Sequence, residues 1–338
     1  MILIFTMEHD ISSSDVIKWL EYFGEEVVRM NADDNLNKFE QITSDGIFFR
    51  NTLTNKIFNL LDAKACWWRR RGISKSSFTE LTNEDVFIKK ELDLTSLING
   101  TNNLINKECD DLIDYIYNKV YDSCQINLGK NLFNLNKLIV NDIAENLKLS
   151  VPNSSIVSNN TQISAFKKQN TNLISKAISN GIYNTIENHR FYSYTELIED
   201  EIINTKTEIN FFPSLIMDQI EKQSEIRSFY IDGHFFSMVI FSQSSNQTKV
   251  DFRKYNNQKP NKTEPFNLPK DIENKLEKLF NALGLNCGSI DLIIDKDGNY
   301  IFLEINPVGQ YGMVSEPCNY NLDKKIAKYL INGSLKEN

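Results

Sequence analysis

The sequence predicts a protein of mixed class, α/β in its N-terminal part and α+β in its C-terminal part. The chain opens with a strand–helix–strand pattern, which is typical of a parallel sheet. From residue 211 onward, apolar runs flank Asp232-Gly233 and Asp297-Gly298, and Asp-Gly between such runs is a strong signal for an antiparallel hairpin. With 338 residues, 41% of them hydrophobic, the chain can bury the cores of two or three domains.

Composition excludes several classes of protein. The net charge is −8 and no long block of Lys or Arg occurs, which argues against general nucleic-acid binding. The longest apolar runs, such as the one at 235–241, are much shorter than the ~20 residues that span a bilayer, and no signal peptide is evident. We therefore expect a cytoplasmic protein that binds neither nucleic acid nor membrane. The five cysteines are widely spaced without a C-x-x-C pair, which favours buried free thiols over a zinc site or disulfides.

The N-terminal elements follow local signals. The apolar start of the chain predicts a strand, and the next segment predicts a helix capped by Ser13 or Ser14 and ended by Gly24. A second strand is expected at 25–31. No G-x-G-x-x-G follows the first strand, so a dinucleotide fingerprint is absent. His9 is interpreted as an ordinary loop residue rather than a catalytic one.

Two further strands are predicted at 46–51 and 64–70, and the second runs into a cluster of arginines. Arg69, Arg70 and Arg71 follow two tryptophans directly. A solvated charge run is one interpretation. The other is a pair or trio of arginines that holds a substrate carboxylate or an acidic peptide. The sequence leaves both open.

The middle of the chain is expected to contain helices at 83–98 and 108–121, separated by the polar stretch NGTNN. A third helix is expected within LNKLIVNDIAENLKL, and a short one near 161–169. Polar residues near 125–135 suggest the first domain boundary. The predicted domains are an N-terminal α/β domain (1–128), a central subdomain (129–213) and a C-terminal subdomain (214–338).

Lys176 stands out in the strand predicted from NLISKAIS. It shares a strand face with Ile174 and Ile178. A lysine in the middle of a half-buried strand is costly unless it meets an anion. The alternative is an edge-strand lysine that discourages aggregation.

The stretch at 287–312 contains the candidate metal ligands. If Asp297 and Gly298 form a two-residue turn, Asp291 lies opposite Glu304, with Asn306 on the same face. Carboxylates about 5 Å apart repel by about 3 kcal/mol, more than a good cross-strand pair contributes. A cation between them is expected, and oxygen-only ligands suit Mg²⁺, which takes further ligands from substrate phosphates. The alternative is a solvated outer face of an ordinary hairpin.

Other candidate ligands precede this hairpin. Residues 217–220 form an apolar segment at the end of a strand, and Glu225 and Arg227 share one face of the next strand. Arg253 is an isolated cation within VDFRKY. A capped helix at 270–283 and a closing helix near 321–331 complete the C-terminal part.

The motif Glu304-Ile305-Asn306-Pro307 resembles the E-x-N metal pair that ends the final hairpin of ATP-grasp enzymes. The resemblance implies an ATP-grasp fold, with an N-terminal parallel βαβ (pre-ATP-grasp) domain, a central lid subdomain and a C-terminal antiparallel-sheet subdomain. It also implies ATP and two Mg²⁺ ions as cofactors. The implied roles are Lys137 and Lys176 for ATP, Met217, Asp218, Gln219 and Ile220 for adenine, Glu225 for ribose, Arg227 and Arg253 for phosphates or an acyl phosphate, and Asp291, Glu304 and Asn306 for the metal ions.

Longer segments resemble one branch of that superfamily. EIRSFYIDGHFFSMVIFSQSSNQTKVDFRKYN and FLEINPVGQYG are similar to the microviridin or graspetide ligases, which macrocyclise ribosomal peptides, and most similar to the grasp-with-spasm branch. CWWRRRG resembles their W-x-R-R segment, which implies Arg69 and Arg70 in substrate binding. Two departures are Asp218, where the family often has Glu, and an Asn-rich rather than glycine-rich loop after Lys176.

The function implied is that of an ATP-dependent ligase. It would phosphorylate Asp or Glu side chains of a precursor peptide and join them to Thr or Ser hydroxyls or Lys amines, releasing ADP and phosphate. The expected partners are a peptide with a leader and an acidic, Thr-containing core, and a second copy of the chain. The alternatives are an ATP-grasp carboxylate–amine ligase acting on a small molecule or protein tail, and a nucleotide-binding module without turnover.

Overall fold

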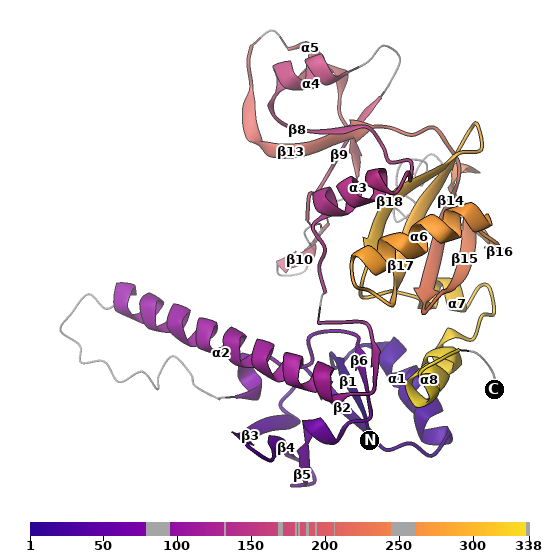
Figure 1. The fold of residues 1–338 in the computed structure, drawn as a ribbon. Coiled ribbons are helices and arrows are strands. Elements are labelled where there is room, and N and C mark those ends of the chain that lie inside the picture. Colours follow the sequence, from indigo (N-terminus) through magenta and orange to yellow (C-terminus); the bar gives the residue numbers. More distant parts are fainter. Residues whose placement is uncertain are drawn as a thin grey trace. The chain divides into compact units, whose positions relative to one another are not determined.

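The computed structural model describes residues 1–78, 95–131, 133–167, 172–179, 181, 183–186, 189–192, 195–205, 207–244 and 261–335. The chain divides into two compact units, Met1–Phe133 with Asn321–Asn338, and Asn134–Tyr320. Each unit is built around its own sheets (Figure 1). The three-domain division at 128/129 and 213/214 stays a prediction.

The first unit contains a four-stranded sheet in the order β2-β1-β6-β7, and every neighbouring pair is parallel. All five residues of β1 are buried, as expected for a parallel sheet covered on both faces. The parallel βαβ opening is therefore confirmed. The strands are β1 (Ile2–Thr6), β2 (Val27–Asn31), β6 (Ala65–Trp68) and β7 (Ile126–Leu128).

Three helices enclose this sheet. Side chains of α2 (Thr95–Ser123) share a hydrophobic core with Leu3 and Phe5 of β1. Helices α1 (Ile11–Tyr22) and α8 (Leu322–Asn332) pack against each other and contact the strands (Figure 1). The C-terminal helix thus completes the N-terminal core.

Two expectations for these helices are wrong. The N-cap of α1 is Asp10, and Ser13 is instead buried within the helix, where its hydroxyl lies 2.8 Å from Thr6 Oγ1. Helix α2 runs through the polar stretch NGTNN without a break, so it does not end at residue 98 and begin again at 108. Burial of Ile116 and Val120 stabilises the helix as a unit, and such packing outweighs weak local propensity. Residues 83–94 of the predicted helix lie outside the described residues.

A small antiparallel sheet completes the first unit, in the order β3-β4-β5. Only its central strand was predicted. Its members are β3 (Asn37–Thr43), β4 (Gly46–Asn51) and β5 (Ile57–Asn59), and the 3-10 turns η1 (Leu60–Asp62) and η2 (Lys75–Ser77) follow them.

The second unit begins with a sheet in the order β12-β9-β13-β8. Helices α4 (Asn160–Phe166) and α5 (Asp200–Asn204) cover one of its faces around a core that includes Ile163, Ile203 and Ile216 (Figure 1). The strands are β8 (Ser154–Asn159), β9 (Leu173–Lys176), β12 (Glu196–Leu197) and β13 (Asn210–Asp218). The Asn-rich segment after Lys176 contains a separate hairpin of β10 (Tyr183–Ile186) and β11 (His189–Tyr192).

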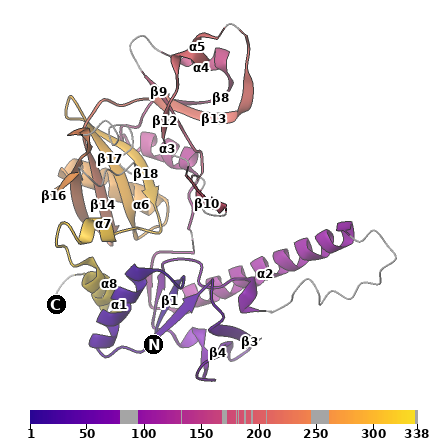
Figure 2. The same cartoon turned by 180° about the vertical axis from the view of Figure 1, so that it is seen from behind.

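A five-stranded antiparallel sheet forms the rest of this unit, in the order β16-β15-β14-β17-β18. Helices α3 (Lys137–Asn146) and α6 (Lys270–Ala282) lie on the same face of it, in front in Figure 1 and behind in Figure 2. The strands are β14 (Lys222–Ile231), β15 (His234–Phe241), β16 (Lys262–Phe266), β17 (Cys287–Asp295) and β18 (Tyr300–Asn306), and the short elements are η3 (Ser242–Ser244) and α7 (Gly312–Ser315).

The two predicted hairpins have different turns. Asp232-Gly233 is a two-residue turn between paired Ile231 and His234, as predicted. Both turn residues have positive φ, 43° and 86°, as a type I′ turn requires. Asp297-Gly298 is not a two-residue turn, because the last pair of β17 and β18 is Ile294 with Tyr300.

The predicted pairing of Asp291 with Glu304 is nevertheless present. Next to the longer loop, the pairing of β17 with β18 is shifted by one residue from the predicted register. Leu292 pairs with Phe302 and Asp291 with Glu304, so Leu303 is an extra, unpaired residue of a bulge, and this bulge restores the predicted register at Asp291. The loop is held by Asp295, whose Oδ1 accepts the backbone N–H of residues 297 and 299. Two deviations from the simple hairpin therefore cancel at the site.

Two expectations about the whole chain were also tested on the described residues. None of their helices combines the length and apolarity needed to cross a bilayer. None of the five cysteines, all of which belong to the described residues, forms a disulfide, and four of them, Cys66, Cys124, Cys287 and Cys318, are buried. The prediction of buried thiols is confirmed for those four, whereas Cys109 is partly exposed.

Candidate functional site

An open pocket in the second unit brings most of the predicted site residues together. It holds about 1010 Å³ of empty space, mouth included, between β9 and β13 of one sheet and β14, β17 and β18 of the other. The predicted residues that line it are Lys176, Met217, Asp218, Gln219, Ile220, Glu225, Arg227, Asp291, Glu304 and Asn306. Prediction from sequence missed Pro152, Thr195, Lys222 and Gln310, which also line it.

Glu304 is paired with two lysines from other elements. Its Oε2 lies 2.6 Å from Lys176 Nζ and 3.4 Å from Lys137 Nζ. Lys137 is the first residue of α3, and its ammonium also donates to the Ser179 carbonyl at 3.1 Å. Strand β9 lies inside its sheet, between β12 and β13, so the edge-strand interpretation of Lys176 is wrong.

Asp291 is paired with Arg227 on the neighbouring strand. A single guanidinium nitrogen, Nη1, donates to both carboxylate oxygens, at 2.9 and 2.8 Å. The other two nitrogens of Arg227, Nε and Nη2, are buried and have no hydrogen-bond partner among the described residues. Buried donors are rarely left unpaired, so these N–H groups indicate a place for an anion.

Glu225 is anchored by a lysine and a serine. Its Oε1 accepts from Lys222 Nζ at 2.7 Å and from Ser242 Oγ at 2.6 Å. Burial raises the pKa of the Glu225 carboxyl, and the two hydrogen bonds and the Lys222 charge offset only part of this effect. Lys222 escaped prediction because it lies three residues from Glu225 along one strand, where alternation places side chains on opposite faces.

The segment 217–220 is held in place by its backbone. Asp218 N donates to Asn153 O at 3.0 Å, and Gln219 N donates to Asn172 O at 2.8 Å. Met217 is buried beside the pocket, and Asp218 Oδ1 is a buried atom without a hydrogen-bond partner in the described part of the chain. An apolar wall beside fixed backbone groups can bind a flat heterocycle and read its edge.

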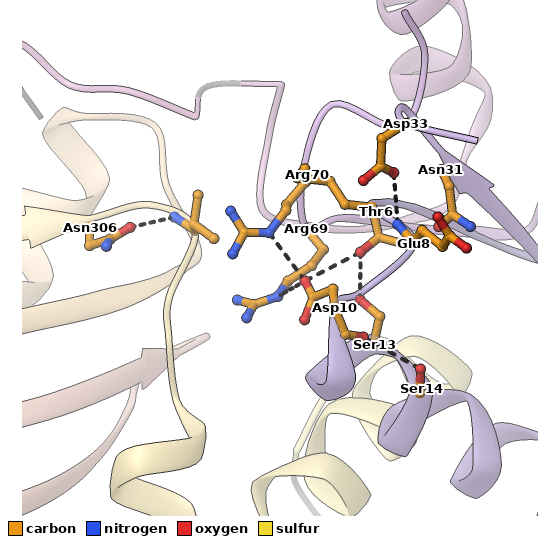
Figure 3. A network of polar contacts seen from close by, with 12 residues as sticks. Thr6, Glu8, Asp10, Ser13, Ser14, Asn31, Asp33, Arg69, Arg70 and Asn306 are labelled. Carbon is orange, nitrogen blue, oxygen red and sulfur yellow. Dashed lines mark hydrogen bonds and ion pairs between the residues drawn. The ribbon is translucent and has the colours of Figure 1, made fainter. Parts of the chain in front are cut away.

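The oxygen atoms of Asp291, Glu304 and Asn306 could hold a metal ion. The two carboxylates are only 16% and 22% exposed and line the pocket, so the solvated-face interpretation of the hairpin is wrong. Asn306 Oδ1 accepts from Val308 N at 3.1 Å (Figure 3), which orients the amide. No group of three or more His, Cys, Asp or Glu among the described residues could hold a metal ion. Two carboxylates and one amide fit Mg²⁺, which takes its other ligands from water or phosphate.

The remaining candidate residues lie elsewhere. Arg69 and Arg70 belong to the first unit, where each Nε contacts Asp10 Oδ2, at 3.0 and 3.3 Å (Figure 3). Arg69 is 3% exposed, so a solvated charge run does not describe it, and it holds a carboxylate of the chain itself. Burial raises the pKa of Asp10, but the two arginines outweigh it and the pKa lies below the ordinary value. Arg253 lies outside the described residues.

Comparison with known proteins identifies the class. Residues 135–330, more than half of the chain, match the RimK-like ATP-grasp domain, and the chain belongs to this family. The predicted ATP-grasp fold is thereby confirmed. A search of the curated proteins found no match.

Solved structures of similar fold cover nearly the whole chain. The macrocyclase MdnC of Microcystis aeruginosa MRC, bound with precursor peptide MdnA, is 24% identical over 99% of this chain and 100% of its own, with a TM-score of 0.74. A Chryseobacterium gregarium RiPP-associated ATP-grasp ligase, in complex with ADP and a leader and core peptide, is 21% identical over 98% and 97%, with a TM-score of 0.73. The ATP-grasp ligase PsnB, complexed with minimal precursor, Mg and ADP, is 12% identical over 99% and 97%, with a TM-score of 0.69. At these identities the likeness establishes a shared fold.

Proposed function

We propose that this chain is an ATP-dependent ligase that macrocyclises a ribosomally made precursor peptide. The observation that carries the proposal is Arg227, whose Nη1 holds Asp291 while two further buried nitrogens have no partner among the described residues. Next to it in the pocket, Glu304 pairs with Lys176, and Lys137 contacts the same carboxylate from α3. Cations and oxygen ligands placed together in this way suit a magnesium-bound polyphosphate.

The proposed contacts fix the orientation of the nucleotide in the pocket. The backbone of 217–220 would bind the adenine, and Glu225 would accept hydrogen bonds from the ribose. Lys137 and Lys176 would exchange part of their contact with Glu304 for contacts with the phosphates. Asp291, Glu304 and Asn306 would hold Mg²⁺, two ions in our proposal, which would neutralise phosphate charge when bound.

The residues of the pocket would then support two successive transfers. A side-chain carboxylate of the peptide attacks the γ-phosphorus, ADP leaves, and an acyl phosphate forms. A Thr or Ser hydroxyl, or a Lys amine, attacks the acyl carbon, releases phosphate and loses its proton, which yields an ester or an amide. Arg227, and Arg253 by resemblance, would stabilise the charge that develops on the transferred group. Orientation of the two peptide groups supplies the rest of the acceleration.

The comparisons support a peptide substrate. MdnC is bound with precursor peptide MdnA, the C. gregarium ligase is in complex with ADP and a leader and core peptide, and PsnB is complexed with minimal precursor, Mg and ADP. We extend this by proposing that the substrate carries a leader and an acidic, Thr-containing core, as in the grasp-with-spasm branch. We also propose that the protein is a cytoplasmic homodimer, that Arg69 and Arg70 contribute to peptide binding, and that residues 129–213 and 214–338 act as lid and base of the ATP site.

The test is incubation of the purified chain with Mg-ATP and a set of leader-bearing peptides whose cores contain Asp, Glu and Thr. The expected result is peptide-dependent ADP release and the loss of one water per new bond in the mass spectrum. Asp291→Asn and Glu304→Gln should abolish both while the protein stays folded. Mild hydroxylamine cleaves esters and leaves amides, so it reports the bond type.

Other outcomes would identify another function. Formation of an amide between a carboxylate and a free amine or amino acid supplied in the assay would indicate a carboxylate–amine ligase. Nucleotide binding without ADP release, with every peptide and every added amine, would indicate a binding module. Unchanged turnover in both carboxylate variants would contradict the site assignment.

A further inference from the structure

Lys222 is a buried lysine at the wall of the pocket, and no step of the proposed reaction uses it. Its side chain is 5% exposed, and its ammonium lies 2.7 Å from Glu225 Oε1. Burying an ammonium group is costly unless it is paired and hydrogen-bonded. The position of this buried ammonium beside the pocket suggests that it has a role in ligand binding.

The backbone is deformed in a way that creates this pair. Residues three apart on a regular strand point to opposite faces of the sheet. Between β14 and β17, Lys222 pairs with Asp295 but Ser224 pairs with Ile294, so Gln223 is an extra residue in β14. This bulge turns Lys222 to the face that carries Glu225. Lys222 lines the pocket beside Glu225, whereas Gln223 is exposed.

The two oxygens of Glu225 are used differently. Oε1 accepts from both Lys222 and Ser242, the latter at 2.6 Å. Oε2 has no hydrogen-bond partner in the described part of the chain, and it is not one of the fully buried unpaired atoms. Because Glu225 lines the pocket, one oxygen is anchored and the other remains available to a ligand.

We infer that Lys222 is a positioning residue, which together with Ser242 orients Glu225 so that Oε2 accepts hydrogen bonds from the ribose hydroxyls of ATP. One carboxylate oxygen has two lone pairs and can serve both hydroxyls. Lys222 thereby contributes to discrimination between ribonucleotides and deoxynucleotides. The inference rests on the proposed ATP-dependent function and deepens it.

The test compares ADP with 2′,3′-dideoxy-ADP in the presence of Mg²⁺, by calorimetric titration of the full chain. Hydrogen bonds to a charged group are each worth about tenfold in affinity or more, so the wild type should prefer ADP by roughly ten- to a hundredfold. Lys222→Met should weaken ADP binding about tenfold and leave dideoxy-ADP binding unchanged. Lys222→Arg, which keeps a cation, should retain part of the preference.

Two further variants sharpen the result. Lys296→Met is the matched control, since Lys296 forms an exposed ion pair with Glu221 outside the pocket, and its preference should equal that of the wild type. Glu225→Gln should lose the preference for ADP over dideoxy-ADP, as Lys222→Met does. The double variant, with both Lys222→Met and Glu225→Gln, should lose no more of this preference than either single variant. If Lys222→Met does not fold, Ser242→Ala removes the other anchor and should lower the preference in the same direction.

Several results would overturn the inference. Equal weakening of ADP and dideoxy-ADP by Lys222→Met would show a general disturbance of the pocket. An unchanged preference in both Lys222→Met and Ser242→Ala would show that Glu225 needs no anchor. Ribose discrimination that depends on Lys222, in a protein that ligates no peptide, would support the inference and contradict the proposed function. Absence of nucleotide binding by the wild type would overturn both.

Discussion

Replacement of Arg227 by Met should destabilise the protein strongly, because it breaks a buried ion pair from one side. Arg227 is 6% exposed and the Asp291 side chain 16% exposed. Methionine fills a similar volume but removes the Arg227 guanidinium from the carboxylate of Asp291. Glu304 lies opposite Asp291 across β17 and β18, so removal of the Arg227 charge also weakens the compensation of the repulsion between these two carboxylates.

The magnitude follows from the geometry. Breaking a buried pair by removing one partner costs about 3–5 kcal/mol, far more than a typical surface substitution. Because Asp291 retains some exposure to the pocket, we expect the lower end of this range, about 3 kcal/mol in the free energy of unfolding. Combining Arg227→Met with Asp291→Asn should recover part of the loss, since the second change removes the negative charge that Arg227 faces in the wild type.

Urea unfolding of the free protein, followed by fluorescence, measures this effect. Arg50→Met is the matched control, because Arg50 pairs with Glu40 on the surface and its loss should barely move the midpoint. With Mg-ADP at a hundred times its dissociation constant, the wild type should gain about 2.7 kcal/mol. The gain of Arg227→Met should be smaller, since Nε and Nη2 would no longer contact the nucleotide. A loss of stability below about 0.5 kcal/mol in Arg227→Met, a value typical of surface sites, would refute the reasoning.

Further predictions concern the first unit. The pKa of Asp10 lies below 3.8, since burial raises it but Arg69 and Arg70 lower it more. The stability this carboxylate contributes is therefore complete above pH ~4 and lost as pH falls through the lowered pKa, so Asp10→Asn should lower stability at neutral pH and flatten its acid dependence in urea titrations. Gly24 and Gly72 both have positive φ, 80° and 72°, but a Cβ on Gly72 would lie 2.7 Å from Phe5 Cα whereas Gly24 has open space. Gly24→Ala should cost about 1–2 kcal/mol and Gly72→Ala clearly more, and equal costs would contradict the role of close approach.

Strand alternation and turn chemistry predicted the strands of the site and one of its two hairpin turns, whereas the pairing in the other hairpin was predicted correctly from a wrong turn. The pairing of Asp291 with Glu304 was derived from a two-residue turn that does not exist. The loop is longer because the Asp295 side chain binds two backbone N–H groups, and the bulge at Leu303 returns the register to the predicted pairing. A one-residue shift places every side chain on the opposite face. The pairing at the site therefore depends on the bulge as well as on the turn.

Alternation along a strand could not predict the partner of Glu225. The bulge at Gln223 moves Lys222 to its face, and a bulge depends on how two strands meet rather than on either sequence. The continuity of α2 has a similar origin. The stretch NGTNN is a poor helix former. The helix is stabilised by side chains nearer its C-terminal end, including Ile116 and Val120, which are buried in the core that also contains Leu3 and Phe5 of β1.

The sequence by itself determined the class of each part, the two hairpins, the family motif Glu304-Ile305-Asn306-Pro307, and the group of residues that would share a pocket. The classes and the hairpins depend on periodicity and turn chemistry over a few residues, whereas the shared pocket was implied by the resemblance to ATP-grasp enzymes. Only the tertiary structure decided which cation meets which carboxylate. Asp291 pairs with Arg227, 64 residues away, and Glu304 pairs with Lys176, 128 residues away, and also with Lys137. The sequence argument placed one cation between the two carboxylates, whereas in the fold each carboxylate has a separate cationic side chain beside it. Burying a charge is costly unless it is paired, and the tertiary structure determines which side chains are close enough to pair.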